Sequence, residues 1–175
     1  MTSGTASIDR LKDLLPQLLA PSAVTGELFL HIELTADLTV GYPMRLVEEV
    51  QTVSMNSIIP IPNMQEQILG LVQSKGYIFW LVDLAHLLGL PPLHSRRRQY
   101  EMIMTNLDSS SLNKTLSTTA TDQHYLGFAA KKIRGTFRVN PDRISPVKSG
   151  FHSELSSCIF GIFDDNGKTI PLINV

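Results

Sequence analysis

The sequence predicts a mainly β protein that consists of two similar small barrels. Residues 68–84 align without gaps with residues 159–175, and nearly every strand position pairs one apolar residue with another. The identical pairs include Gly70 and Gly161, Gly76 and Gly167, and Leu81 and Leu172. Each copy carries four or five short apolar stretches in about 60 residues, separated by turn residues, which is typical of a small antiparallel barrel. The duplication therefore predicts two β subdomains.

The expected division of the chain follows from this repeat. We expect an N-terminal helical extension over residues 1–26 and a folded region over 27–175. The folded region is expected to contain a first subdomain at about 27–92 and a second at about 100–175, joined by a linker at 93–99. Upstream of the two aligned hairpins, Ile58 lies over Ile144 and Val47 over Ile133, so the repeat extends beyond them.

In the first half, the apolar spacing after Ser7 predicts a helix that Pro16 kinks and Pro21 ends. Strands are expected at 27–34, 50–53, 68–72 and 77–82, with a turn at 35–41, a helical turn at 45–48 and an extended segment at 57–63. Residues 73–76 predict a tight hairpin, because Gly76 readily adopts a positive φ. Asp83 is expected to cap a short helix that ends at Gly89.

In the second half, strand patterns recur at 100–107, 124–130, 136–139, 157–163 and 169–175. The stretch 108–123 is rich in Ser and Thr and poor in apolar residues, so we expect a mobile loop there. The run Arg96–Arg98 in the linker is expected to be a solvated charge run rather than a phosphate site.

Composition excludes several classes of function. The 15 basic and 16 acidic residues give a formal net charge of −1, which provides no electrostatic reason to expect nucleic acid as a partner. No apolar run approaches the ~20 residues of a membrane span, so no membrane insertion is expected. The N-terminal residues lack the order of a secretory signal, and the expected location is the cytoplasm.

Catalytic signals are weak. The five histidines are scattered, and the spacing of His, Cys, Asp and Glu predicts neither a metal site nor a cofactor. Cys158, the single cysteine, is placed in the strand 157–163 and is expected to be a buried, inert thiol. Residues 164–167 favour a hairpin turn over a calcium loop. With no nucleophile motif or phosphate-binding loop, no catalytic residue is expected, and a binding or scaffold role is favoured.

The repeat resembles the CheW family of chemotaxis coupling proteins. The resemblance is carried by Ile58-Ile-Pro-Ile-Pro62, Ile68-Leu-Gly-Leu-Val72, Lys75-Gly76, Leu81-Val-Asp-Leu84 and Leu87-Leu-Gly89, and by the matching segments of the second half. It covers roughly residues 27–175. Two positions depart from the family pattern: Lys75 replaces an arginine, and Trp80 replaces a proline. The N-terminal segment and residues 79–92 look like the cyanobacterial phototaxis branch, whose members include PixI-like proteins.

This resemblance implies a CheW-like fold of two five-stranded, SH3-like barrels with short helices. It also implies a non-catalytic adaptor that couples a methyl-accepting receptor to a CheA-type histidine kinase. The kinase's regulatory domain would pack barrel to barrel, and the receptor tip helix would lie in a groove between barrels. By this likeness, the partner-binding residues are expected to be Val47, Glu48, Lys75 and Gly76.

Three alternatives stay open. One is a scaffold of another sensory system, which the sequence alone does not distinguish from a CheW-like adaptor. Another is a small β-barrel module that binds nucleic acid, which would need basic residues interleaved with aromatic residues on its strands. The last is an enzyme that uses Cys158 or a histidine.

Overall fold

The computed structural model describes residues 26–93, 98–107, 124–147, 151, 153–165 and 167–175. The predicted N-terminal helix, most of the linker with Arg96 and Arg97, and the predicted loop at 108–123 lie outside the described residues. The chain is mainly β, as predicted.

The described part of the chain forms strands joined by very short helices. The strands are β1 (Glu27–Glu33), β2 (Thr39–Pro43), β3 (Val47–Ser54), β4 (Ile68–Ser74), β5 (Tyr77–Asp83), β6 (Gln99–Leu107), β7 (His124–Ala130), β8 (Lys132–Val139), β9 (Ile144–Ser145), β10 (Ile159–Asp165) and β11 (Lys168–Ile173). The helices are η1 (Met44–Leu46), η2 (Met55–Ser57), α2 (Leu84–Leu87), η3 (Pro141–Arg143) and α3 (Ser153–Cys158).

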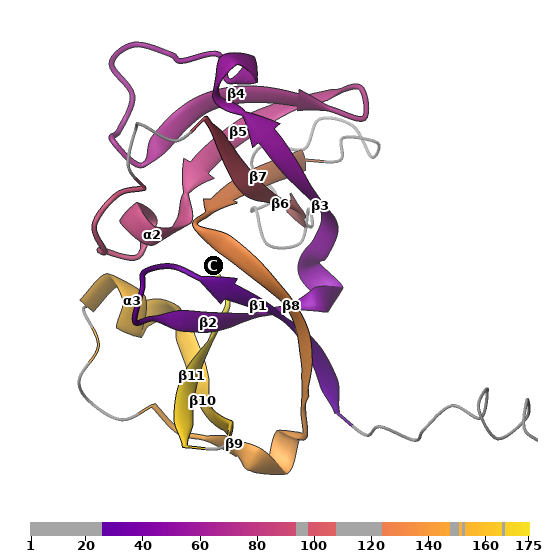
Figure 1. Ribbon diagram of the computed structural model, residues 1–175, viewed down its shortest axis with the longest axis vertical. Coiled ribbons are helices and arrows are strands. Elements are labelled where there is room, and N and C mark those ends of the chain that lie inside the picture. Colours follow the sequence, from indigo (N-terminus) through magenta and orange to yellow (C-terminus); the bar gives the residue numbers. More distant parts are fainter. Residues whose placement is uncertain (1–25, 94–97, 108–123, 148–150, 152, 166) are drawn as a thin grey trace, which may run out of the picture.

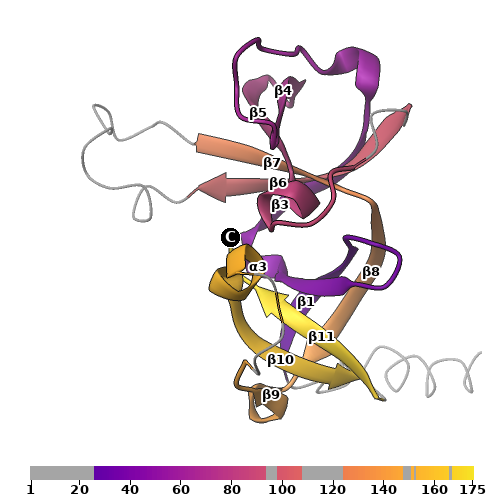
Figure 2. The ribbon, with the colours of Figure 1, turned by 90° about the vertical axis from the view of Figure 1, so that its left-hand side faces the viewer.

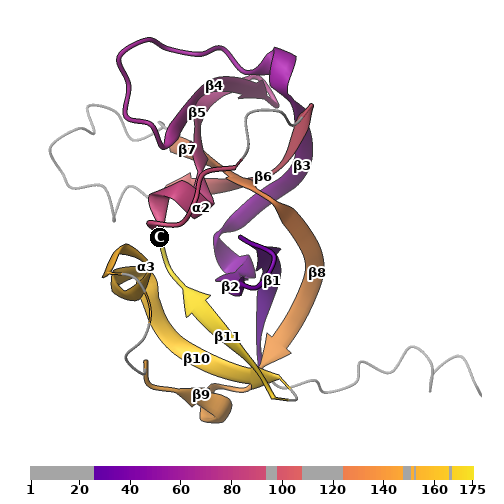
Figure 3. The same ribbon diagram turned by 60° about the vertical axis from the view of Figure 1, so that its left-hand side comes forward.

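Two sheets are stacked one above the other, and each curls toward a barrel (Figure 1). Barrel A has the strand order β8-β1-β2-β11-β10-β9, and barrel B has the order β3-β6-β7-β5-β4. Helices α2 and α3 face each other across the junction between the two barrels (Figure 3).

Each barrel contains strands from both halves of the sequence. Strands β1 and β2 belong to the sheet of β8–β11, whereas β6 and β7 belong to the sheet of β3–β5. Figure 2 shows one crossing, where the chain passes from β7 in barrel B directly into β8 in barrel A. The predicted subdomains 27–92 and 100–175 are therefore the two sequence repeats, but not the two barrels. Pairing between distant strands decides this exchange, and local sequence patterns carry no signal for it.

The register confirms the predicted repeat. Leu81 pairs with Gly127 in a parallel ladder of barrel B, and its counterpart Leu172 pairs with Gly41 in barrel A. The two hairpins also share a bulge, which lies before Gly70 in one copy and before Gly161 in the other. Both positions require glycine. A Cβ at Gly70 would lie 2.4 Å from the Ile59 carbonyl oxygen, and a Cβ at Gly161 would lie 2.3 Å from Ile144 Cγ2.

Three apolar clusters hold the fold together. One fills barrel B and includes Val72, Phe79, Leu81, Met102 and Met104. Another fills barrel A and includes Phe29, Val139, Phe163, Ile170 and Leu172. The largest lies between the barrels and takes Leu30, Ile32 and Tyr42 from barrel A, with Val82, Ile103 and Phe128 from barrel B. The outer face of each sheet is thus buried where the barrels meet.

Several predicted boundaries were wrong. Residues 39–41, predicted as the end of a turn, belong to β2, because β1 pairs with this strand and Val40 and Tyr42 are buried between the barrels. The helical turn lies at Met44–Leu46, so Val47 and Glu48 belong to β3. Cys158 is half-buried and ends α3, whereas a buried strand position was predicted. The backbone of the preceding serines forms this helix before the strand begins at Ile159.

Candidate partner-binding surface

The β4–β5 hairpin lies against β3, at the opening between the two edges of barrel B. Its turn consists of Lys75 and Gly76, whose φ values of 49° and 83° match the primed turns that suit hairpins. Lys75 Nζ lies 3.6 Å from Glu49 Oε2, and the Ser74 hydroxyl donates to the same oxygen at 3.4 Å. Because β3 and β4 are the two edge strands of the sheet, Glu49 closes the barrel through side chains.

The predicted site residues are only partly brought together. Lys75 and Gly76 are exposed at the hairpin tip, as a contact surface requires. Lys75 pairs with Glu49, which was not among the predicted site residues. A bulge between Val47 and Glu49 shifts the register of β3 against β6, and it leaves Glu48 exposed beside the pair. Local sequence patterns do not reveal such a bulge, which is why Glu49 was missed.

Val47 occupies an intermediate position. Its side chain packs against the cluster between the barrels but stays partly accessible. Met44 and Leu46, in the η1 crossover just before it, are also partly buried against the same cluster. The three side chains form an apolar shoulder where the chain passes from barrel A to barrel B.

Two tyrosines lie at the same end of barrel B. The ring centroids of Tyr77 on β5 and Tyr125 on β7 are 4.7 Å apart. The pKa of the Tyr125 hydroxyl is raised by desolvation, and to a lesser extent by Tyr77 and by the negative charge of Glu48. Neither ring was among the predicted site residues. Tyr125 could not be placed here from local patterns, because β7 reaches this site only through its pairing with β5 and β6.

An apolar strip runs across the outer face of barrel B. Ile59 is bridged to Leu71, and Leu71 is paired with Trp80, so the three side chains share one face of the sheet. Ile78 lies two residues from Trp80 on the same face. The exposed fractions are 61% for Ile59, 68% for Ile78 and 36% for Trp80. Exposed apolar surface of this extent often marks an interaction site.

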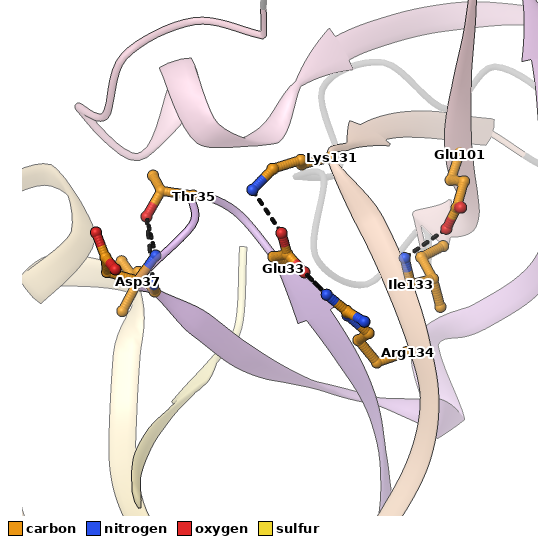
Figure 4. A network of polar contacts seen from close by, with 8 residues as sticks. Glu33, Thr35, Asp37, Glu101, Lys131, Ile133 and Arg134 are labelled. Carbon is orange, nitrogen blue, oxygen red and sulfur yellow. Dashed lines mark hydrogen bonds and ion pairs between the residues drawn. The ribbon is translucent and has the colours of Figure 1, made fainter.

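The junction between the barrels is fixed by a buried carboxylate. Glu33, at the end of β1, accepts from Arg134 Nε at 2.9 Å and lies 2.5 Å from Lys131 Nζ (Figure 4). These hydrogen bonds lower the pKa of Glu33 to about 2. Lys131 and Arg134 lie on either side of the first residues of β8. Glu33 on β1 therefore holds the segment that connects β7 with β8 against barrel A.

Strand β6 fixes both crossovers from the side of barrel B. Glu101 accepts from the Ile133 amide at the β7–β8 crossover (Figure 4). Thr105 donates its hydroxyl to the Leu46 carbonyl at 2.5 Å in the η1 crossover, and it accepts from the Tyr42 hydroxyl at 3.3 Å. The candidate surface on β3 is therefore held in a defined position relative to barrel A.

Within the described ranges, no group of three or more His, Cys, Asp or Glu side chains is arranged to hold a metal ion. None of the helices in the described part of the chain has the length and apolar character that crossing a membrane requires.

Comparison with known proteins agrees with this architecture. The family model of the CheW-like domain matches residues 29–175. Among solved structures, the crystal structure of the scaffolding protein TtCheW from Thermoanaerobacter tengcongensis is similar, with a TM-score of 0.66 and 18% sequence identity. The similarity covers 86% of this chain and 90% of TtCheW. No curated protein gives a significant match. The two-barrel fold and the family match together show that the chain belongs to the CheW-like domain family, whose members are non-catalytic scaffold proteins of chemotaxis signalling.

Proposed function

We propose that this chain is a non-catalytic, cytoplasmic adaptor that couples a methyl-accepting receptor to a CheA-type histidine kinase. We further propose that it serves a phototaxis system of the PixI-like branch. Family membership supports the general role. The observation that carries the proposal is the surface of barrel B. The β4–β5 hairpin there carries most of an exposed apolar strip, and its turn holds Lys75, which pairs with Glu49.

The apolar strip is the proposed docking site for the kinase. Ile59, Leu71, Ile78 and Trp80 lie on the outer face of barrel B, the face that is buried against barrel A elsewhere in the same sheet. The kinase's regulatory domain is expected to have the same fold, so it can cover the strip as one barrel covers the other within this chain. A close-packed apolar contact of this kind provides most of the binding free energy at protein interfaces.

The receptor is proposed to bind beside β3. The apolar shoulder of Met44, Leu46 and Val47 offers partly exposed side chains to an amphipathic helix. Glu48 and Lys75 lie at its border and would set the orientation of the helix through their charges. This assignment keeps Val47, Glu48, Lys75 and Gly76 as proposed partner contacts and adds Glu49.

Pull-down with each partner tests the proposal. The intact chain is expected to retain the kinase's regulatory domain, and the double variant Ile59→Ser/Ile78→Ser is expected to lose it. Val147→Ser is the matched control, because Val147 is an exposed apolar residue in barrel A. If neither the kinase domain nor the receptor tip fragment binds at tens of micromolar, the coupling role is wrong and a scaffold of another sensory system is favoured.

A further inference from the structure

The two barrels have structurally equivalent openings, because the chain is duplicated. Val47 pairs with Thr105 in barrel B, and Ile133 pairs with Ile32 in barrel A. The residue after each is the bulge residue, so Glu48 corresponds to Arg134. By the same register, the pair Asn106 and Tyr125 corresponds to the pair Glu33 and Thr39.

In barrel A this opening contains a complete ion pair. Arg134 donates to Glu33 through Nε and Nη2, at 2.9 Å and 2.5 Å. Both groups come from the chain itself, and Lys131 adds a second cation. The carboxylate of Glu33 is therefore fully paired by cations of the same chain, without any partner.

In barrel B the same positions carry hydrogen-bond acceptors that suit a guanidinium, but no guanidinium. Glu48 replaces the arginine, and Asn106 replaces the carboxylate. Within the described part of the chain, Glu48 has no ion-pair partner, since Lys75 is bound to Glu49. The register brings Tyr125 to the same opening, because it pairs with Asn106, the residue after the partner of Val47. The Tyr125 ring contacts that of Tyr77, whose side chain remains exposed. An exposed carboxylate beside two aromatic rings is an environment that favours a cation.

We propose that the opening of barrel B, formed by Glu48, Asn106, Tyr77 and Tyr125, binds an arginine side chain of a protein partner, in the place that Arg134 occupies in barrel A. The proposal that the arginine belongs to a protein partner rests on the proposed coupling function. The proposal that the site binds a guanidinium is independent of that function.

Arginine fits this opening better than lysine. A guanidinium stacks on an aromatic ring while its N–H groups reach a carboxylate and an amide oxygen in the same plane. The chain itself shows the stacking mode, since the Arg143 guanidinium lies 4.8 Å from the centroid of the Phe163 ring in barrel A. Glu48 would accept from one edge of the guanidinium, and the Asn106 side-chain oxygen would accept from the other.

The direct test is an NMR titration of the full chain with a short arginine peptide, acetyl-Gly-Arg-Gly-amide. The expected result is a saturable shift of the Tyr77 and Tyr125 ring resonances in the millimolar range, as befits one or two weak contacts. The matched citrulline peptide has the same shape without the charge, and it is expected to bind at least about tenfold more weakly. Equal responses to the two peptides, or no response to either at about 20 mM, would overturn the proposal.

Variants test whether the arginine peptide binds at the opening of barrel B. Glu48→Gln is expected to weaken arginine binding about three- to tenfold, whereas Glu66→Gln, at another exposed glutamate, should leave it unchanged. The double variant Glu48→Arg/Asn106→Glu transplants the ion pair of barrel A and should abolish the response. A folded double variant that still binds the peptide would overturn the proposal, and if it fails to fold, Glu48→Gln decides. No kinase or receptor enters these titrations, so their outcome is separate from that of the coupling function.

Discussion

Lys75, at the tip of the β4–β5 hairpin, lies 3.6 Å from Glu49 on β3, and this contact connects the two edge strands of barrel B. Lys75 stands where the family resemblance places an arginine. An ammonium group satisfies Glu49 as a point charge, whereas a guanidinium would hold the carboxylate through two parallel hydrogen bonds. The pair lies at the surface, so its contribution to the stability of the fold is small.

Charge reversal at Lys75 separates binding from folding. Lys75→Glu should lower the free energy of unfolding by less than about 1 kcal/mol, because exposed ion pairs contribute little. Partner binding, measured by isothermal titration calorimetry, should weaken by about 1–3 kcal/mol if the group is desolvated in the complex. The exchange Lys75→Glu/Glu49→Lys should recover part of the loss. Binding of both partners as tight as that of the unaltered chain would show that this hairpin is no contact site.

Removal of the Glu33 charge should make the fold less stable and change its response to acid. Glu33→Gln is expected to lower the free energy of unfolding by about 1–3 kcal/mol at neutral pH, because buried charge-assisted hydrogen bonds are lost. The pKa of Glu33 is about 2 in the folded chain and near 4.5 in the unfolded chain, so its stabilising effect is complete above pH 4.5 and is lost as the pH falls toward 2.

Urea unfolding at several pH values measures this effect. The difference between the unaltered chain and Glu33→Gln should shrink steadily below pH 4.5. A difference that stays constant across this range would mean that Glu33 contributes through packing rather than through its charge.

The two glycines of the β4–β5 hairpin should respond differently to alanine. Gly70→Ala is expected to destabilise the chain by more than about 2 kcal/mol, since φ is 142° and the new methyl group would lie 2.4 Å from a backbone oxygen. Gly76→Ala should cost only about 1 kcal/mol, because its φ of 83° is strained but no atom lies within 4 Å of the new Cβ. Thermal unfolding followed by circular dichroism ranks the two, and the reverse order would contradict the described register.

Thr105 is expected to contribute more to the stability of the fold than a side chain of its size usually does. Thr105→Val removes the hydroxyl that bonds both Leu46 and Tyr42, so the buried Tyr42 hydroxyl and the partly buried Leu46 carbonyl each lose a partner. The expected loss of stability is about 1–3 kcal/mol. Thr52→Val on the exposed face of β3 is the control and should change stability by less than about 0.5 kcal/mol. If both variants unfold at the same urea concentration, the crossover is not held by this threonine.

Local sequence features predicted the parts of the fold that depend on local chemistry. The glycine pairs of the repeat, the Lys75-Gly76 turn and the Asp83 cap of α2 all occur as expected. The exchange of strands between the barrels was not predictable, because it depends on pairings between distant parts of the chain, such as Leu30 with Thr136 in barrel A and Trp80 with Leu126 in barrel B. The candidate site shows the same limit. Lys75 and Gly76 were expected from the family resemblance, but Glu49 and Tyr125 reach this hairpin only through a bulge and a distant strand.

We propose that the chain binds receptor and kinase at the same time, through different parts of barrel B. The most direct measurement is the mass of the complex formed by the chain, the kinase's regulatory domain and a receptor tip fragment, determined by size-exclusion chromatography with light scattering. We expect a single ternary species, which Ile59→Ser/Ile78→Ser reduces to a complex of chain and receptor alone. Competition between the two partners for the chain, or binding of only one of them, would contradict it.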